Sequence, residues 1–428
     1  MKLIKGGRVI DPKTKTDAIL DILVEGPRIL KIGKDLPVGD AELYSAEGQV
    51  VCPGLVDVHV HFRDPGLTYK EDVFSGARSA ARGGFTSVVC MANTKPPMDC
   101  PETLQQLLNR AAQAIIHVYT VATASKGLRG QEHTDMVALK EGGCVGFSDD
   151  GIPLMDTAFL RETMARCKEL NLPLSLHEED PRLITNPGFH AGEAAQKLGL
   201  VGAPSVSESS MIARDMMLAL DTGAHVHMQH LSCKESVQLL RVAKAMGARV
   251  TGEVTPQHLF LTQEALLDQG ALAKVNPPLR TEEDRQALIQ GLKEGVIDCI
   301  ATDHAPHSRE EKSTEGKAIA KTPSGLIGLE TALGLCISSL VKPGHLTLPQ
   351  MLEKMTYRPA QLYGLKAGYL AEGETADITI LDPDRDWQVP DHFVSKASNS
   401  PFIGQKLTGK VLATMCDGKW VYESKVDE

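Results

Sequence analysis

Two histidines separated by one residue mark the segment of this chain best suited to chemistry. The segment reads DVHVHFR from residue 57 to residue 63, and its apolar and polar residues alternate as in a β-strand. Side chains two residues apart on a strand share a face, so His59 and His61 can both reach one cation, at roughly 2.0–2.1 Å for zinc. The same alternation places Arg63 on that face, where its guanidinium can hold a carboxylate through two hydrogen bonds.

Further metal-competent side chains follow other apolar runs. They are Asp149 and Asp150 after 144–147, His177 ending 174–177, His230 ending 225–230, and Asp303 after 299–302. Barrel enzymes place their chemistry at the carboxyl ends of strands, and imidazoles with carboxylates are typical ligands of zinc or a similar metal. Taken singly, each has a structural alternative: a turn for the aspartate pair, a core histidine for His177, and a helix N-cap for Asp303.

The middle of the chain must position these residues, and it alternates strand-like runs with longer amphipathic segments such as Glu102–Ala114 and Ser236–Ala245. The expected strands are Gly54–His61, Ser87–Met91, His117–Ala122, Cys144–Phe147, Leu174–His177, His225–His230, Arg249–Val254 and Cys299–Thr302. Repeated βα units of this number predict an α/β fold with a (β/α)₈ TIM-like barrel over residues 53–365. An open, doubly wound sheet stays an alternative.

Both ends of the chain are rich in short apolar runs separated by turn signals. The expected strands there are Lys2–Ile4, Ile19–Val24, Arg28–Ile32, Asp377–Leu381, Val411–Cys416 and Trp420–Glu423. We expect residues 1–52 and 366–428 to fold together as one small composite β-sandwich.

Composition narrows the classes of partner. The 428-residue chain has a net charge of −10, 4% aromatic residues and no basic run, which argues against nucleic acid and favours a small-molecule substrate. Its 9 cysteines are irregularly spaced and form no C-x-x-C pair, as expected for reduced thiols in the cytoplasm. The start of the chain turns polar before a signal-peptide core develops, and no run of about 18 apolar residues predicts a membrane span.

Longer motifs around the candidate residues resemble the dihydroorotase family. Segments 57–65 (DVHVHFRDP) and 301–312 (ATDHAPHSREEK) look like the two signatures of that family. Segments 91–94 (MANT), 276–280 (NPPLR) and 373–378 (GETADI) are similar to its long bacterial type. The resemblance covers essentially the whole chain. It implies a metal-dependent amidohydrolase barrel with a β-sandwich, and reversible interconversion of (S)-dihydroorotate and N-carbamoyl-L-aspartate in pyrimidine synthesis.

The resemblance also implies roles for individual residues. One or two Zn²⁺ ions, with two favoured, would be held by His59, His61, Asp150, His177, His230 and Asp303. In this arrangement the first two histidines bind one metal, the other two bind the second, and Asp150 bridges them. Asp303 would serve as the general acid–base while activated water attacks the ring amide. The implied substrate contacts are His61, Arg63, Asn93, Asn276, His307, Ser324 and Gly325, with the last two matched most loosely.

Other functions stay open at this point. Hydantoinases, dihydropyrimidinases and many allantoinases bridge their metals with a carboxylated lysine, whereas segment 146–151 (GFSDDG) contains no lysine. A non-catalytic, dihydroorotase-like partner of aspartate transcarbamoylase would lack ligands that this chain keeps. The resemblance is compatible with a homodimer and with a complex with aspartate transcarbamoylase.

Two local features also have alternatives. Arg63 could form a salt bridge to Asp64 or Asp72 instead of holding a substrate. Segment 308–322 is rich in Glu, Lys and Gly and has no evident apolar anchor, so we expect it to be mobile, either as a lid over the pocket or as an exposed linker.

Overall fold

A ring of parallel strands forms the centre of the computed structural model, which describes residues 1–424 of the chain. The strands of the ring are β6 (Leu55–Val60), β7 (Phe85–Cys90), β8 (His117–Thr120), β9 (Leu174–Leu176), β10 (Val226–Met228), β11 (Val250–Val254) and β12 (Cys299–Ile300). They pair in the orders β6-β7-β8 and β12-β11-β10-β9. Phe147 bridges Ala122 to Leu174, and His304 bridges to Val60, so the two sheets close into one ring. The predicted barrel is confirmed.

The segment expected to be the strand Cys144–Phe147 is reduced to the bridges made by Phe147, so the prediction of a continuous strand is wrong. A side chain at Gly146 would lie 2.7 Å from the ring of Tyr363, which shows how closely the backbone approaches its neighbours there. Opposite it, Pro173 has no N–H to offer and only accepts a bond from the Phe147 amide (3.0 Å). The segment nevertheless occupies a strand position in the ring.

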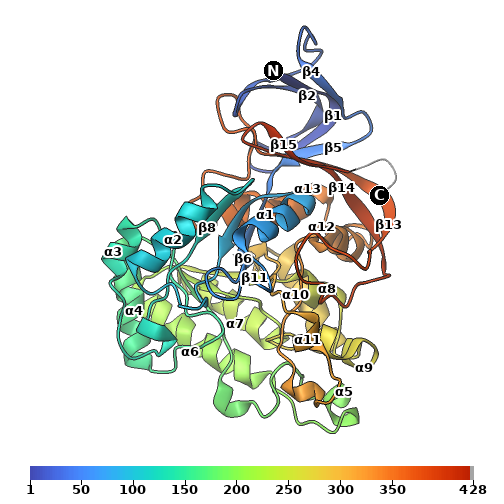
Figure 1. Cartoon of the computed structure of the whole chain (residues 1–428). Helices are drawn as coiled ribbons and strands as arrows, with labels where there is room; N and C mark the ends of the chain where they lie inside the picture. Colours follow the sequence, from blue (N-terminus) through green and yellow to red (C-terminus); the bar gives the residue numbers. More distant parts are fainter. Residues whose placement is uncertain (425–428) are drawn as a thin grey trace.

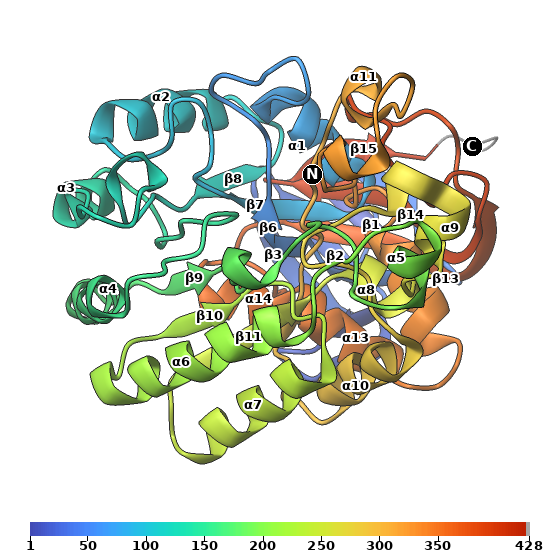
Figure 2. The ribbon, with the colours of Figure 1, turned by 90° about the horizontal axis from the view of Figure 1, so that it is seen from below.

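Helices surround the strands, and Figure 2 shows α2, α3, α4, α6, α7 and α10 at the periphery of the barrel. The α-helices are α1 (Val73–Arg82), α2 (Pro101–Ala111), α3 (Met136–Glu141), α4 (Thr157–Leu170), α5 (Glu193–Lys197), α6 (Val206–Thr222), α7 (Lys234–Ala245), α8 (Pro256–Phe260), α9 (Ala265–Gln269), α10 (Glu282–Lys293), α11 (Arg309–Lys312), α12 (Ala332–Cys336), α13 (Leu348–Met355) and α14 (Tyr357–Leu362). Local sequence sets their starts. The side chain of Asp72 accepts bonds from the amides of Phe74 and Ser75 at the start of α1, and Thr281 caps α10 in the same way.

A second sheet contains strands from both ends of the chain and lies at one end of the barrel (Figure 1). Its strands are β1 (Lys2–Asp11), β2 (Thr16–Glu25), β3 (Arg28–Gly33), β4 (Glu42–Ser45), β5 (Val50–Pro53), β13 (Ile378–Gln388), β14 (Lys406–Cys416) and β15 (Lys419–Glu423). The order is β15-β14-β13-β5-β1-β2-β3, with β4 paired to β1. The antiparallel pair of β13 and β5 joins the two ends of the chain. The exact domain limits at residues 52 and 365 stay a prediction.

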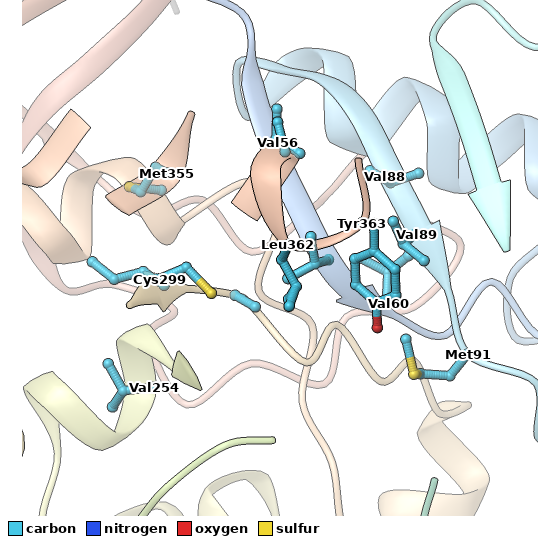
Figure 3. Packing of buried hydrophobic residues seen from close by; sticks show 14 of the residues in the cluster. Val56, Val60, Val88, Val89, Met91, Val254, Cys299, Met355, Leu362 and Tyr363 are labelled. Atoms are coloured by element: carbon cyan, nitrogen blue, oxygen red, sulfur yellow. The ribbon is translucent and has the colours of Figure 1, made fainter. Parts of the chain in front are cut away.

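Buried apolar side chains hold the barrel strands in place. Figure 3 shows Leu362 and Tyr363, at and just after the end of α14, packed in one cluster with Val56 and Val60 of β6. The hydroxyl of Tyr363 also lies 2.6 Å from the Oγ of Ser175 on β9, so this buried polar group has a partner. These contacts fix the strands from whose ends the site is built. Among residues 1–424, the structure contains no helix long and apolar enough to cross a membrane.

Candidate metal centre and active site

Four histidines and one aspartate from four separate segments of the chain meet at one end of the barrel. Asp150, which follows the bridging Phe147 segment, lies at their centre. Its Oδ1 is 3.5 Å from His59 Nε2, and its Oδ2 is 3.5 Å from His61 Nε2. The same Oδ1 is 3.8 Å from His177 Nδ1 and 3.9 Å from His230 Nε2. Oδ1 of this carboxylate therefore faces three imidazoles, and Oδ2 faces the fourth, that of His61.

Asp303 reaches the same cluster from beyond β12. Its Oδ1 lies 3.0 Å from His61 Nε2 and 3.5 Å from His59 Nε2. Its backbone has a φ of 50°, in the left-handed region, as often occurs at functional turns. Burial raises the pKa of Asp303, but the neighbouring His59 and His61 lower it more, and the net shift is downward. Asp303 is therefore placed as an ionised carboxylate beside the histidines.

The donor set fits a metal centre. His59 Nε2 and Asp150 Oδ1 are buried and have no hydrogen-bond partner among the described residues. Buried polar atoms without partners are costly, and a cation between them would satisfy both. Ligand atoms that share a tetrahedral zinc lie roughly 3.3–3.5 Å apart, because each bond is about 2.0–2.1 Å long. Two groups could hold an ion: His59, His61 and Asp150, and Asp150, His177 and His230.

Two glutamates that the sequence analysis missed orient histidines of the cluster. Glu253 Oε1 lies 2.5 Å from His59 Nδ1, and Glu179 Oε2 lies 3.0 Å from His177 Nε2. A carboxylate on one ring nitrogen fixes the tautomer and leaves the other nitrogen free for a metal. For Glu253 a signal was present in the sequence, since a carboxylate inside the apolar strand segment 249–254 must find a buried partner.

Asn93, expected to contact the substrate, bonds to the cluster itself. Its Oδ1 lies 3.0 Å from His61 Nδ1, and its Nδ2 donates to Asp150 Oδ2 at 3.1 Å. The side chain thereby orients His61 as the glutamates orient the other two histidines. A substrate contact by Asn93 stays a prediction.

The position of Arg63 follows from a turn and not from strand alternation. β6 ends at Val60, and Arg63 has a φ of 59°. Its Nε donates to the carbonyl of Pro306 at 3.3 Å. Burial lowers the pKa of its guanidinium, against the opposing effect of Asp303 and Asp150. The reasoning from alternation was wrong for this residue, although the turn leaves it close to both carboxylates.

The salt bridges considered for Arg63 are absent from the described part of the chain. Asp64 pairs with Arg110 at 2.8 Å, and Asp72 pairs with Lys396 at 2.6 Å. No carboxylate in residues 1–424 forms an ion pair with Arg63. Its guanidinium is thus available to an anionic ligand.

The other expected substrate contacts are partly engaged within the protein. His307 Nε2 lies 2.9 Å from the carbonyl of Ser324, and its Nδ1 is 3.4 Å from the Nζ of Lys70. Burial and neighbouring cations lower the pKa of His307 to about 3, so it is neutral. The amide of Gly325 donates to the carbonyl of Lys274 at 2.8 Å.

Asn276 presents an open acceptor. Its Oδ1 is buried and has no hydrogen-bond partner within residues 1–424. Among the residues expected to contact the substrate, Asn276 and Arg63 therefore have the most unused bonding capacity.

Segment 308–322 is anchored more firmly than expected. The Nζ of Lys312 is buried and donates to the carbonyls of Pro323 (3.0 Å) and Gly325 (2.9 Å). Ile319 and Ala320 pack against a buried apolar cluster. The expectation that the segment lacks apolar anchors was wrong, because short helical turns direct these residues inward. A lid role stays a prediction.

Comparisons with known proteins place this geometry in a family. Residues 50–421 match the Amidohydrolase family. A dihydroorotase of Lactococcus lactis is 53% identical over 99% of this chain and 99% of its own length. The chain belongs to the dihydroorotase family of amidohydrolases. A dihydroorotase of Clostridioides difficile is also 53% identical, over 99% of this chain and all (100%) of its own length.

Solved structures similar to this one include a hydantoinase and a dihydropyrimidinase. An L-hydantoinase (dihydropyrimidinase) from Arthrobacter aurescens superposes with a TM-score of 0.87 at 26% identity, covering 98% of this chain and 96% of that one. A dihydropyrimidinase from Brevibacillus agri gives a TM-score of 0.85 at 25% identity, covering 99% and 95%. Their identity is about half that of the dihydroorotases, so the sequence relatives decide the branch and the structures support the shared barrel.

Proposed function

We propose that this member of the dihydroorotase family catalyses the reversible hydrolysis of (S)-dihydroorotate to N-carbamoyl-L-aspartate, a step of pyrimidine synthesis. One observation supports the substrate most directly. A half-buried guanidinium, Arg63, has no ion-pair partner among residues 1–424 and lies near Asp303 and Asp150 in the cluster. The carboxylate of dihydroorotate would supply that partner, whereas hydantoin and allantoin carry no carboxylate.

The residues of the cluster would hold two Zn²⁺ ions, His59 and His61 on one side of Asp150 and His177 and His230 on the other. Asp150, between the imidazole pairs, would take the place of the carboxylated lysine of hydantoinases. When bound, metal ions of this kind acidify water and polarise the ring carbonyl. Metal analysis of the purified protein would show whether one or two ions are bound per chain.

The side chains of the protein then move one proton and hold the ring. Asp303, ionised and 3.0 Å from His61 Nε2, would accept a proton from the attacking water. As the bond between the ring carbonyl and the ring nitrogen breaks, Asp303 would return that proton to the nitrogen, which becomes the amide of the carbamoyl group. The former carbonyl carbon becomes a carboxylate, and the second proton of the attacking water is released to the solvent. General acid–base help of this kind contributes about 10²–10⁴-fold.

Substrate orientation falls to the side chains with unused capacity. Arg63 would bind the carboxylate through its fork of donors. Asn276 Oδ1, buried and without a partner among the described residues, would accept a hydrogen bond from a ring N–H of the substrate. His307, Ser324 and Gly325 would complete the pocket wall beside Arg63.

Turnover of three cyclic substrates tests this proposal. Purified, zinc-loaded protein should hydrolyse dihydroorotate far faster than allantoin or hydantoin. Preference for either of the latter would contradict the proposal and favour the hydantoinase or allantoinase alternative. Purified protein that binds no zinc and turns over none of the three after zinc is added would favour a non-catalytic partner of aspartate transcarbamoylase.

The proposed function also implies a compartment and an assembly for the protein. All nine cysteines are free thiols, which suits a reducing cytoplasm. A homodimer, alone or with aspartate transcarbamoylase, is the proposed assembly, and light scattering with and without the transcarbamoylase measures both.

A further inference from the structure

Glu253 lies in β11 beside the metal cluster, and its side chain is 0% exposed. Both of its oxygens are used. Oε1 lies 2.5 Å from His59 Nδ1 and accepts a bond from the backbone amide of His230 at 3.1 Å. Oε2 lies 3.1 Å from His227 Nε2. One carboxylate therefore contacts a residue from each of the two metal-binding groups.

These contacts set the geometry of both groups. With its proton on Nδ1 facing Glu253, His59 presents Nε2 toward Asp150 and Asp303, each 3.5 Å away. His230 has a φ of 33°, a conformation that residues with a side chain rarely adopt. The hydrogen bond from its backbone amide to Glu253 helps to hold that turn. Loss of the carboxylate would release both residues together.

His227 holds the far side of Glu253. Its Nδ1 lies 2.9 Å from the Oγ1 of Thr251, and the same hydroxyl lies 3.1 Å from Nε2 of His225. No lysine or arginine within residues 1–424 forms an ion pair with Glu253, whose only ion-pair contacts are the two imidazoles. A buried carboxylate without a cation is costly, so a cation bound through His59 would stabilise it, and the carboxylate would in turn stabilise the cation.

We propose that Glu253, itself held by His227, is a positioning residue that couples the two halves of the metal centre and strengthens metal binding in both. This inference rests on the proposed function, because it requires that the cluster hold metal. It adds to that function a pair of residues, on adjacent strands β10 and β11, that touch neither metal nor substrate.

Glu253→Gln tests the carboxylate with the least change of shape. The amide oxygen can still accept from His59 and from the His230 amide, and the amide nitrogen can face His227 in its other tautomer. Only the charge is lost, and we expect zinc affinity to fall about 10- to 100-fold. Affinity is measured on metal-free protein by competition with a chromophoric chelator, and the Co²⁺-loaded protein should show an altered visible spectrum.

Glu330→Gln is the matched control for Glu253→Gln. The Glu330 carboxylate is also largely buried, but it bonds to Ser79 Oγ (2.9 Å) and to the Val394 amide (3.0 Å) and pairs with Arg82 (3.5 Å). Within residues 1–424 it contacts no imidazole. Zinc affinity should stay at the wild-type value, although the free energy of unfolding falls.

Two histidines, His225 just before β10 and His227 within it, test independently whether the contact between His227 and Glu253 matters for metal binding. His225 and His227 both contact Thr251, but only His227 reaches Glu253. His227→Ala should weaken zinc binding about tenfold, and His225→Ala should leave it unchanged. Thermal unfolding of the metal-free proteins separates positioning from stability, because a purely structural role would lower the midpoint without changing the affinity of the folded protein.

The outcomes separate this inference from the proposed function. Wild-type zinc affinity in both Glu253→Gln and His227→Ala would overturn the inference while leaving dihydroorotate hydrolysis by the wild type intact. Equal losses in the control variants would also overturn it. If the wild-type protein binds no metal, the proposed centre fails and the inference fails with it.

Discussion

Replacement of Arg63 by methionine separates substrate recognition from stability. Methionine keeps much of the apolar stem and removes the guanidinium. The described structure gives Arg63 one hydrogen bond, to the Pro306 carbonyl at 3.3 Å, and no ion pair. Loss of one such bond costs at most about 1–2 kcal/mol, and removal of a half-buried charge without a partner offsets part of that cost. The unfolding midpoint should therefore change little.

The effect on catalysis should be much larger. Truncating one partner of a hydrogen-bonded, buried charge pair costs about 2–5 kcal/mol. At about 1.36 kcal/mol per factor of ten, kcat/KM for dihydroorotate should fall between about 30-fold and about 5,000-fold. Arg63→Lys keeps the charge but not the fork of donors. Its kcat/KM should lie between that of the wild type and that of Arg63→Met.

The assay measures kcat/KM for dihydroorotate and for dihydrouracil, in the Arg63 variant and in a control variant of Arg110. Dihydrouracil lacks the carboxylate, so its slower hydrolysis should be nearly unaffected by Arg63→Met. Arg110→Met is the control, because Arg110 pairs with Asp64 at 2.8 Å and is 41% exposed, and kcat/KM should stay within about twofold. An unchanged kcat/KM for dihydroorotate in Arg63→Met, or an equal fall for both substrates, would refute the assignment.

Three further variants test other parts of the structure. Asp303→Asn should lower kcat by at least about 100-fold while measured zinc content stays close to wild type, and near-normal turnover would exclude Asp303 as the base. The bond to Asp377 (3.0 Å) raises the pKa of His117 above 6.5, so its stabilisation is present below that pH and is lost as pH rises through the folded-state pKa. At about pH 6 the wild type should unfold with a free energy up to about 1 kcal/mol higher than that of His117→Gln, and this difference should vanish by about pH 9. A difference that stays constant with pH would contradict this prediction. Gly76→Ala should gain about 1 kcal/mol in helix propensity but lose about 1–3 kcal/mol, because the new Cβ would lie 2.4 Å from the Phe62 ring, and urea denaturation should show a net loss.

The sequence carried enough information for the barrel and for the metal cluster. Strand periodicity is a local signal, and the chemistry-bearing residues follow strands whose ends meet at one side of a barrel. Asp150, His177 and His230 could therefore be expected near His59 before any distance was known. The strand expected at 144–147 is reduced to the bridges of Phe147. Its neighbours there include Tyr363, which is distant in sequence, and Pro173, which has no N–H to pair with.

Positions set by turns and by contacts between distant segments could not be predicted. Arg63 is placed by a left-handed turn after β6, not by alternation. Asn93 bonds to Asp150, and Glu253 bonds to His59, across separations of 57 and 194 residues. No local pattern reports such pairs. The apolar neighbours of Glu253 indicated only that its charge needed a buried partner.

Zinc titration of the metal-free protein with dihydroorotate turnover as the readout tests the central claim most directly. We predict no turnover without metal, a rise with added zinc, and a plateau at two ions per chain. Full turnover of rigorously metal-free protein, or zinc binding at the cluster without any dihydroorotate hydrolysis, would contradict it.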